Sequence, residues 1–304
     1  MDMRFLSFAI AALLVSACQP ETSVGGPSAP QTSAPDAAHL RIATWNMEHL
    51  AEKNASGCRP REDADYAKLR SYASALDADV IAFQEVESLA AARRVFDPAQ
   101  YDIIMETRTG TPDSTPPCND KPGLFLNRQA VGFAIRKGLS VEHHPDLTVL
   151  QVGDPNLRSA VDITLKDPAG SPIRLLAVHL KSGCAADLDR PACPVLQKQA
   201  RMLEGWIDQR AKEDTRFAIL GDFNRRLALP GDAIWSELDR PPGATDLAIA
   251  AGDTRPRCDP KYTSFIDQIV IDPRIAGDRF SFAELPYAGE RLSDHCAISI
   301  DVKR

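Results

Sequence analysis

The sequence predicts a mixed α/β domain, because short apolar runs of β-strand composition are interleaved with two segments of helical periodicity. The chain has 304 residues, of which 44% are hydrophobic and 25% are charged. These fractions are typical of a soluble globular protein that buries a sizeable core. One domain of about 250 residues is enough to hold all of these elements, and no internal repeat divides it.

Eight runs rich in β-branched and aromatic residues are predicted to be buried strands. They cover residues 40–45, 80–83, 130–135, 160–165, 173–179, 217–220, 265–271 and 296–302. Two stretches rich in Pro, Gly, Ser and Thr, at 109–123 and 239–260, are predicted to be surface loops, because apolar strands resume directly after each. We therefore expect one domain over residues 40–304.

Two segments between these runs are predicted to be helices, because apolar residues recur in them at helical spacing. The first stripe consists of Tyr66, Leu69, Tyr72, Ala73 and Leu76. The second consists of Leu196, Ala200, Leu203, Trp206 and Ile207. Each segment has a single apolar stripe, so each helix should cover one face of a sheet.

The first 18 residues have the layout of a secretory signal. Arg4 precedes an apolar run over residues 5–15, which is too short to span a bilayer comfortably, and small residues follow it. Residues 15–18 resemble the bacterial lipobox, in which Cys18 becomes the lipidated first residue of the mature protein. A plain signal peptide with an incidental cysteine is the alternative.

Residues 19–39 are rich in Pro, Ser, Thr, Gly and Ala without hydrophobic periodicity, which predicts a flexible linker. The sequence thus predicts an exported bacterial lipoprotein, anchored in the membrane by a lipid on Cys18. In the lipoproteins that it resembles, a residue such as Gln19 after the cysteine favours the outer membrane. We expect the domain on the periplasmic side or at the outer membrane, as a monomer.

Six further cysteines, an even number in a chain predicted to be exported, indicate disulfide bonds. Cys184 and Cys193 bracket a short polar loop and are the expected pair, whereas the sequence leaves the other pairings open. A zinc site formed by these two cysteines and His179 is the alternative. Irregular spacing and the lack of a fourth ligand disfavour it.

Polar residues that suit catalysis or metal binding gather at the ends of the predicted strands. They are Asn46, Glu85, His179, Asp222, Asn224, Asp267, Asp294 and His295. Strand ends are where α/β sheets place ligands, because the loops there converge on a crevice. Taken singly, Asn46, Asp222 and Asn224 are ordinary turn residues and His295 suits a core position. Their joint occurrence predicts one functional site.

The motifs around these residues resemble those of the endonuclease/exonuclease/phosphatase superfamily. In the family's order they are Thr44-Trp45-Asn46, Gln84-Glu85, Val178-His179-Leu180, Gly221-Asp222-Phe223-Asn224, Phe265-Ile266-Asp267 and Ser293-Asp294-His295. Each motif alone is weak, but six in order argue against accidental resemblance. The resemblance implies a four-layer α/β sandwich, in which two mixed β-sheets pack face to face with outer helices and the site lies in a cleft at one end.

The resemblance also implies a metal-dependent phosphoric ester hydrolase. Glu85 is the expected metal ligand, with Asp294 and Asn46 nearby. Oxygen ligands with few carboxylates suit Mg²⁺, for which Mn²⁺ is the expected substitute. In the family pattern, Asp222 orients or deprotonates the attacking water, and Asn224 donates a hydrogen bond to the developing oxyanion.

Two histidines complete the expected catalytic set. Asp267 is expected to fix the tautomer of His295 and to stabilise its imidazolium. His179 matches a second histidine of the deoxyribonuclease-like members, where it lies against the leaving group and is oriented by the carboxylate that corresponds to Glu85. Four basic residues are candidates for binding phosphate. They are Arg225, Arg226, Lys181 and Arg128.

Hydrolysis of a phosphodiester is therefore the predicted reaction, and a nuclease is the first choice because the motif around His179 suits diester cleavage. The alternatives are a phospholipid or sphingomyelin phosphodiesterase, a phosphatase of small phosphate esters and, from another class, a non-catalytic surface binding lipoprotein. The formal net charge of −7 indicates no overall basic face, although a local groove can still be basic. The expected partner is a phosphoester, with nucleic acid preferred.

Overall fold

Two mixed six-stranded sheets form the centre of the structure, a computed structural model. The strands of the first sheet are β1 (His39–Leu50), β2 (Val80–Val86), β3 (Tyr101–Met105), β4 (Ala130–Arg136), β11 (Ser281–Leu285) and β12 (Ala297–Lys303). Those of the second are β5 (Ser140–His143), β6 (Val161–Lys166), β7 (Ile173–His179), β8 (Arg216–Asp222), β9 (Ala248–Ile249) and β10 (Asp267–Ile271). The strand orders are β11-β12-β1-β2-β4-β3 and β5-β6-β7-β8-β10-β9.

The structure describes Met1 and residues 39–108, 115–166, 171–186, 188–239, 246–277 and 280–303. The predicted signal peptide at 1–18 and linker at 19–39 thus lie outside the described residues, apart from Met1 and His39. Residues 34–304 form one compact unit. Among the described residues, no helix has the length and apolar character needed to cross a membrane.

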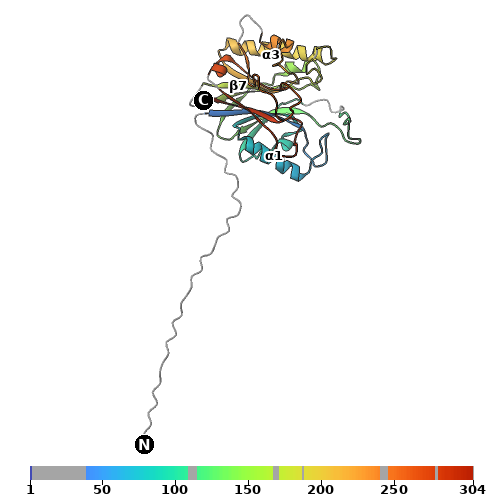
Figure 1. Cartoon of the computed structure of the whole chain (residues 1–304), viewed down its shortest axis with the longest axis vertical. Coiled ribbons are helices and arrows are strands. Elements are labelled where there is room, and N and C mark those ends of the chain that lie inside the picture. The colour runs from blue at the N-terminus through green and yellow to red at the C-terminus, as the bar shows by residue number, and fades with distance from the viewer. Residues whose placement is uncertain are drawn as a thin grey trace. The chain divides into compact units, whose positions relative to one another are not determined.

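Helices cover the outer faces of the sheets. Figure 1 shows α1 (Asp63–Leu76) and α3 (Cys193–Lys212) on opposite sides, with β7 between them. The predicted stripe of α1 packs on outward residues of the first sheet such as Trp45 and Phe83, and that of α3 packs on Phe217 and Ile219. Three shorter helices are α2 (Leu89–Arg93), α4 (Ala233–Leu238) and α5 (Pro273–Gly277). The predicted four-layer α/β sandwich is confirmed.

The inter-sheet core shows how the sequence positions polar residues at one end. Successive side chains of a strand point to opposite faces, so every second residue of β1 lies inside. Leu40 and Ile42 belong to the core between the sheets, and Thr44 and Asn46 continue the same face. Inward residues of β7, β8 and β10 are also apolar until the strand reaches the same end of the sandwich. The inward residues at that end are His179, Asp222 and Asp267.

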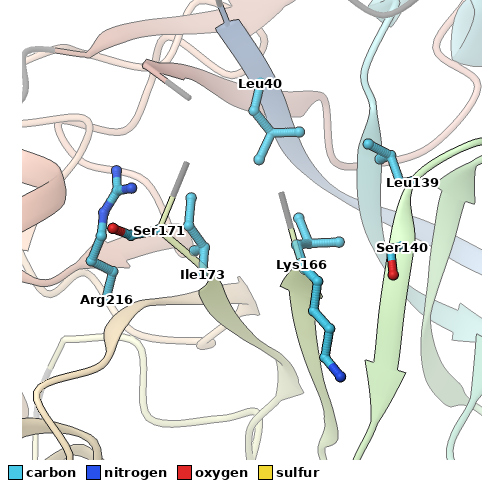
Figure 2. A pocket seen from close by; sticks show the side chains of 8 residues that line it. Leu40, Leu139, Ser140, Lys166, Ser171, Ile173 and Arg216 are labelled. Carbon is cyan, nitrogen blue, oxygen red and sulfur yellow. The ribbon is translucent and has the colours of Figure 1, made fainter. Parts of the chain in front are cut away.

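The carboxylates at the opposite end of the sandwich are paired with arginines, among them Asp301 with Arg41 and Asp79 with Arg136. Figure 2 shows a small pocket there, with Leu40 at the start of β1 and Ile173 at the start of β7. Its volume is about 20 Å³, enough for about one water molecule. Its charged lining residues are Lys166, which pairs with Glu142 at 2.6 Å, and Arg216. The functional site is therefore expected at the end of the sandwich that carries His179, Asp222 and Asp267.

Two strand boundaries differ from the prediction. β1 continues beyond Asn46 and β2 beyond Glu85, with a register shift in their pairing between Asn46 and Leu50. Asn46 and Glu85, two of the three metal-ligand candidates, therefore lie within strands rather than after them. A bulge of this kind redirects side chains, which sequence periodicity does not reveal.

Three disulfide bonds are formed, Cys58–Cys118, Cys184–Cys193 and Cys258–Cys296. The predicted pairing of Cys184 with Cys193 is confirmed. Because these two cysteines are bonded to each other, neither is a thiolate ligand, and the alternative zinc site with His179 is excluded.

Candidate active site

Three of the candidate residues form a row across the second sheet. His179 and Asp222 are register partners on the parallel strands β7 and β8, and Asp222 and Asp267 are partners on the antiparallel strands β8 and β10. Directly opposed residues lie close enough for their side chains to interact. Gly221 allows this approach, since a Cβ atom there would lie 1.9 Å from the carbonyl oxygen of Val178. The row therefore requires a glycine before Asp222.

Asn46 joins the first sheet to this row. It is 1% exposed, and its Nδ2 donates a hydrogen bond to Asp222 Oδ2 at 3.1 Å. Its Oδ1 accepts from the backbone N–H of Glu48 at 3.0 Å. Both ends of the amide are therefore held, and the Asp222 carboxylate is fixed between the sheets.

Glu85 adopts a strained backbone conformation on β2. Its φ of 61° lies in the left-handed region, which costs a non-glycine residue about 1–3 kcal/mol unless the surrounding structure imposes it. Glu85 Oε2 accepts from the backbone N–H of His49 at 3.1 Å, and Oε1 lies 3.7 Å from His179 Nε2. No described residue donates a hydrogen bond to Oε1, so this oxygen is available to a ligand.

The loop before β12 is fastened to β1 and so places His295. Ser293 Oγ donates to the carbonyl oxygen of Asn46 at 2.7 Å and accepts from the backbone N–H of His295 at 3.1 Å. Tyr287 donates its hydroxyl proton to the carbonyl oxygen of His295 at 2.6 Å. Arg61, which is 4% exposed, also ties this loop to β1 by donating to the carbonyl oxygens of Met47 and Leu292.

The imidazole of His295 lies among carboxylates. Its Nδ1 is 2.6 Å from Asp267 Oδ2, and its Nε2 is 3.7 Å from Asp294 Oδ1 and 3.9 Å from Asp222 Oδ2. Burial alone lowers the pKa of His295, but Asp267, followed by Asp222 and Asp294, outweighs burial and raises this pKa well above its usual value. In the metal-free protein His295 is therefore an imidazolium at neutral pH.

Asp222 is the centre of the cluster. Its Oδ1 accepts from the backbone N–H of Asn224 at 2.7 Å, and its Oδ2 lies 3.6 Å from His179 Nε2. Burial raises the pKa of Asp222 to about 7, although His295 opposes this shift. A carboxylate with a pKa near neutrality has the protonation behaviour that a general base requires.

His179 is held as a neutral imidazole. Burial and then the positive charge of Arg158 lower the pKa of His179 well below its usual value. Its ring is 4% exposed, and Nδ1 has no hydrogen-bond partner among the described residues. A neutral imidazole donates a hydrogen bond but does not serve as a charged acid at neutral pH.

The donor set fits a hard divalent cation. Glu85 Oε1 and the partly exposed Asp294 offer carboxylate oxygens, and ligand atoms of Asp222, Asp267 and His295 lie within 4.8 Å of one another. Asp267 Oδ1 is buried and makes no hydrogen bond within the described part of the chain. Oxygen-rich sites with few carboxylates suit Mg²⁺ and Mn²⁺.

Asn224 and Lys181 flank the cluster. Asn224 has a φ of 53°, which asparagine tolerates well, and its Nδ2 donates to the carbonyl oxygen of Leu180 at 3.2 Å. The backbone N–H of Lys181 donates to Gln199, and its Nζ donates to the carbonyl oxygen of Ser182 at 3.2 Å. Both residues lie directly after the strands that carry His179 and Asp222.

Arg225, a predicted phosphate contact, is 3% exposed, and its guanidinium is already engaged by other groups of the protein. Nε and Nη2 contact Asp232 Oδ2 at 2.7 and 2.6 Å, and Nη1 donates to the carbonyl oxygen of Cys184 at 3.0 Å. Arg226, in contrast, stands over the ring of Tyr262. Arg128 donates to the carbonyl oxygen of Glu106 and is half-buried.

Arg158 is a candidate that motif reasoning missed. Its Nε and Nη2 donate to the carbonyl oxygens of His179 and Leu180 at 3.3 and 3.0 Å. Its charge interacts with Glu85 and Asp222. A basic residue just before an apolar strand was the only available signal in the sequence.

The sequence matches the profile of the Endonuclease/Exonuclease/phosphatase family over residues 43–295. A search of curated proteins finds no match. Similar solved structures include truncated Caenorhabditis elegans TDP2, the human Nocturnin catalytic domain with bound sulfate anion, and D. rerio TDP2 complexed with single strand DNA product. Their identities to this chain are 16%, 14% and 18%, and their TM-scores are 0.58, 0.56 and 0.54. The matches cover 88%, 87% and 88% of this chain and 98%, 94% and 99% of those chains. At such identities the likeness shows the fold alone.

Proposed function

The chain belongs to the endonuclease/exonuclease/phosphatase family, whose members hydrolyse phosphoesters, and we propose that this protein hydrolyses a phosphodiester in the cleft around Asp222. The observation that carries the proposal is the position of Asp222. Its carboxylate, with a pKa near 7, lies 3.6 Å from one imidazole and 3.9 Å from another and accepts a hydrogen bond from Asn46. Such an arrangement can take a proton from water and stabilise charge on both sides of a phosphate.

In the proposed reaction, Asp222 accepts the proton of the attacking water while Asn46 holds the carboxylate in place. His295, kept protonated by Asp267, places a positive charge against the phosphate oxygens. Neutral His179 donates a hydrogen bond to an oxygen of the reacting group, a role that fits its lowered pKa better than proton donation from an imidazolium would. Asn224 is the expected second amide donor.

The family depends on divalent metals, and Glu85 is the proposed principal ligand for Mg²⁺, with Asn46 and Asp294 beside it. When bound, the ion supplies Lewis-acid charge neutralisation at the phosphate. Arg158 adds a fixed positive charge next to Glu85 and Asp222. The positive charges of the ion and of Arg158 offset the negative charge of the carboxylates in the cleft, so that an anionic substrate can bind there.

Nucleic acid is the proposed substrate. The structure of D. rerio TDP2, which shares this fold, contains a single strand DNA product. Incubation of the mature protein and Mg²⁺ with single-stranded and plasmid DNA, phospholipid vesicles and bis(p-nitrophenyl) phosphate tests the assignment. We expect cleavage of DNA and of the small diester. Release of phospholipid headgroups without DNA cleavage would favour the lipid phosphodiesterase, and no hydrolysis at all would favour a binding protein.

The lipid on Cys18 is part of the proposal. β1 begins at the end of the sandwich away from the cleft. A Cys18→Ala variant should move from the membrane fraction to the soluble fraction and retain its specific activity. Retention of this variant in the membrane fraction would contradict the anchor.

A further inference from the structure

A second cavity adjoins the catalytic histidine. It has a volume of about 420 Å³, and His295, Asp267 and Asp294 lie at its edge. This volume falls within the usual range for sites that bind small organic molecules and exceeds what a single phosphate group needs. The rest of the lining comes mainly from residues 256–266, so one loop determines the character of the cavity.

A stacked pair of side chains forms one wall. The guanidinium carbon of Arg226 lies 4.0 Å from the ring centroid of Tyr262, a residue that is 40% exposed. Lys261 Nζ lies 4.7 Å from the same centroid and also pairs with Asp259 at 3.0 Å. Arg226 has no carboxylate partner among the described residues, unlike its neighbour Arg225. Its planar guanidinium is therefore available to a ligand.

The other lining residues make the pocket amphipathic. Phe265, which is 6% exposed, and the Cys258–Cys296 disulfide provide apolar surface. Arg291 lies on the lining and donates to the carbonyl oxygen of Asp294 at 2.6 Å. Apolar surface and two arginines in one lining suit a planar ring that carries a negatively charged substituent.

We propose that Arg226 and Tyr262 form a stacking platform for the nucleobase next to the scissile phosphate, which selects single-stranded nucleic acid. The inference rests on the proposed phosphodiesterase function and specifies its substrate class. Unpaired bases are held by stacking on aromatic rings and on arginine planes, whereas bases within a duplex are already stacked on one another. Arg291, which also lines the pocket, is the proposed contact for the adjoining phosphate.

The kinetic test compares an oligonucleotide with a substrate that lacks a base. The variants are Arg226→Ala, Arg226→Lys, Tyr262→Ala and Tyr262→Phe. Arg226→Lys keeps the positive charge but removes the planar guanidinium. Loss of one stacked base should raise KM for a single-stranded oligonucleotide about 5- to 100-fold. The change for the same oligonucleotide with an abasic residue next to the scissile phosphate should be at least about fivefold smaller, because no base is left to stack. Tyr262→Phe should retain most of the wild-type KM, and Arg201→Ala on α3 is the matched exposed-arginine control.

A binding test separates this inference from the catalytic proposal. In a His295→Ala background, an oligonucleotide containing 2-aminopurine should lose fluorescence on binding, and Arg226→Ala or Tyr262→Ala should abolish this quenching. Unchanged KM values and unchanged quenching in folded variants would overturn the platform even if the enzyme cleaves DNA. If the wild-type protein hydrolyses none of the substrates but the quenching still depends on Arg226, the proposed reaction is overturned and the platform is retained.

Discussion

Replacing Asp222 with asparagine should remove the proton acceptor of the proposed reaction with little change in volume. Both carboxylate oxygens accept hydrogen bonds, Oδ2 from Asn46 and Oδ1 from the backbone N–H of Asn224. An amide has only one acceptor oxygen, so either orientation of the new side chain sets its N–H₂ group against a donor. We expect a structural cost of about 1–3 kcal/mol in addition to the loss of catalysis.

The catalytic loss can be estimated from the role of Asp222. Burial raises the pKa of Asp222 to about 7, close to the pH at which a general base is most effective. Loss of a general base lowers kcat by about 10²–10⁴-fold, equivalent to about 2.7–5.5 kcal/mol in the barrier. The assay measures kcat and KM for bis(p-nitrophenyl) phosphate with Mg²⁺. A kcat within about fivefold of wild type would refute the assignment of Asp222 as base.

The same substitution should alter the pH dependence of stability in the metal-free protein. The folded pKa of about 7 lies above the ordinary aspartate value of 3.8, so the folded state binds the proton more tightly than the unfolded state. The resulting stabilisation is complete below the unfolded pKa and is lost as pH rises through the folded pKa. Unfolding by urea after EDTA treatment should therefore show the variant gaining stability relative to wild type between about pH 4 and about pH 8.

A buried aspartate outside the cleft provides the control. Asp162 is 3% exposed and accepts hydrogen bonds from Arg174 and Trp206. Asp162→Asn should lower the free energy of unfolding but leave kcat of the folded protein near the wild-type value. Equal losses of kcat in both variants would show that the effect of Asp222→Asn is structural.

Three further substitutions test other parts of the account. Arg158→Met should lower kcat/KM about 10²-fold in steady-state kinetics, because it removes a fixed cation beside the reacting phosphate, and a normal value would exclude that role. Replacing Cys258 and Cys296 with serine opens a disulfide with a sequence separation of 38 and should cost about 4 kcal/mol, seen as an unfolding midpoint below that of wild type without reductant, and an unchanged midpoint would contradict this contribution. Arg225→Met leaves Asp232 as an unpaired buried charge and should cost about 3–5 kcal/mol in urea unfolding, whereas an unchanged midpoint would contradict the buried pair.

The central strands were predictable because their residues are buried on both faces. All residues of β4 and all but the first of β8 are buried, so each is apolar over most of its length. Edge strands were not predicted. β5 and β11 are largely exposed and therefore lack an apolar run, and β9 has only two residues. The helices α2, α4 and α5 are too short to show helical periodicity.

The candidate site was predictable in its residue types but not in its orientations. Family motifs identified Glu85, Asp222 and His295, and the structure brings them into one connected cluster. The consecutive residues Arg225 and Arg226 were equivalent in the sequence. Only the fold shows that the first is buried against Asp232 and that the second is half-buried over the ring of Tyr262, because the partners lie elsewhere in the chain.

The backbone at the site was also outside the reach of the sequence. Glu48, His49 and Glu85 adopt positive φ angles although none is a glycine. Their conformations depend on the bulge between β1 and β2 and on hydrogen bonds such as that from His49 to Glu85. Local propensity opposes such angles, so tertiary contacts must impose them.

The central claim is that oxygen ligands around Glu85 and the Asp222–His295 cluster act on one phosphodiester. Metal titration tests this claim most directly. Protein stripped with EDTA is titrated with Mg²⁺ while hydrolysis of bis(p-nitrophenyl) phosphate is followed, in wild type and in Glu85→Gln. We predict saturable activation of wild type, with an activation constant raised at least about tenfold in the variant. Full activity in EDTA, or identical activation curves for the two proteins, would contradict the account.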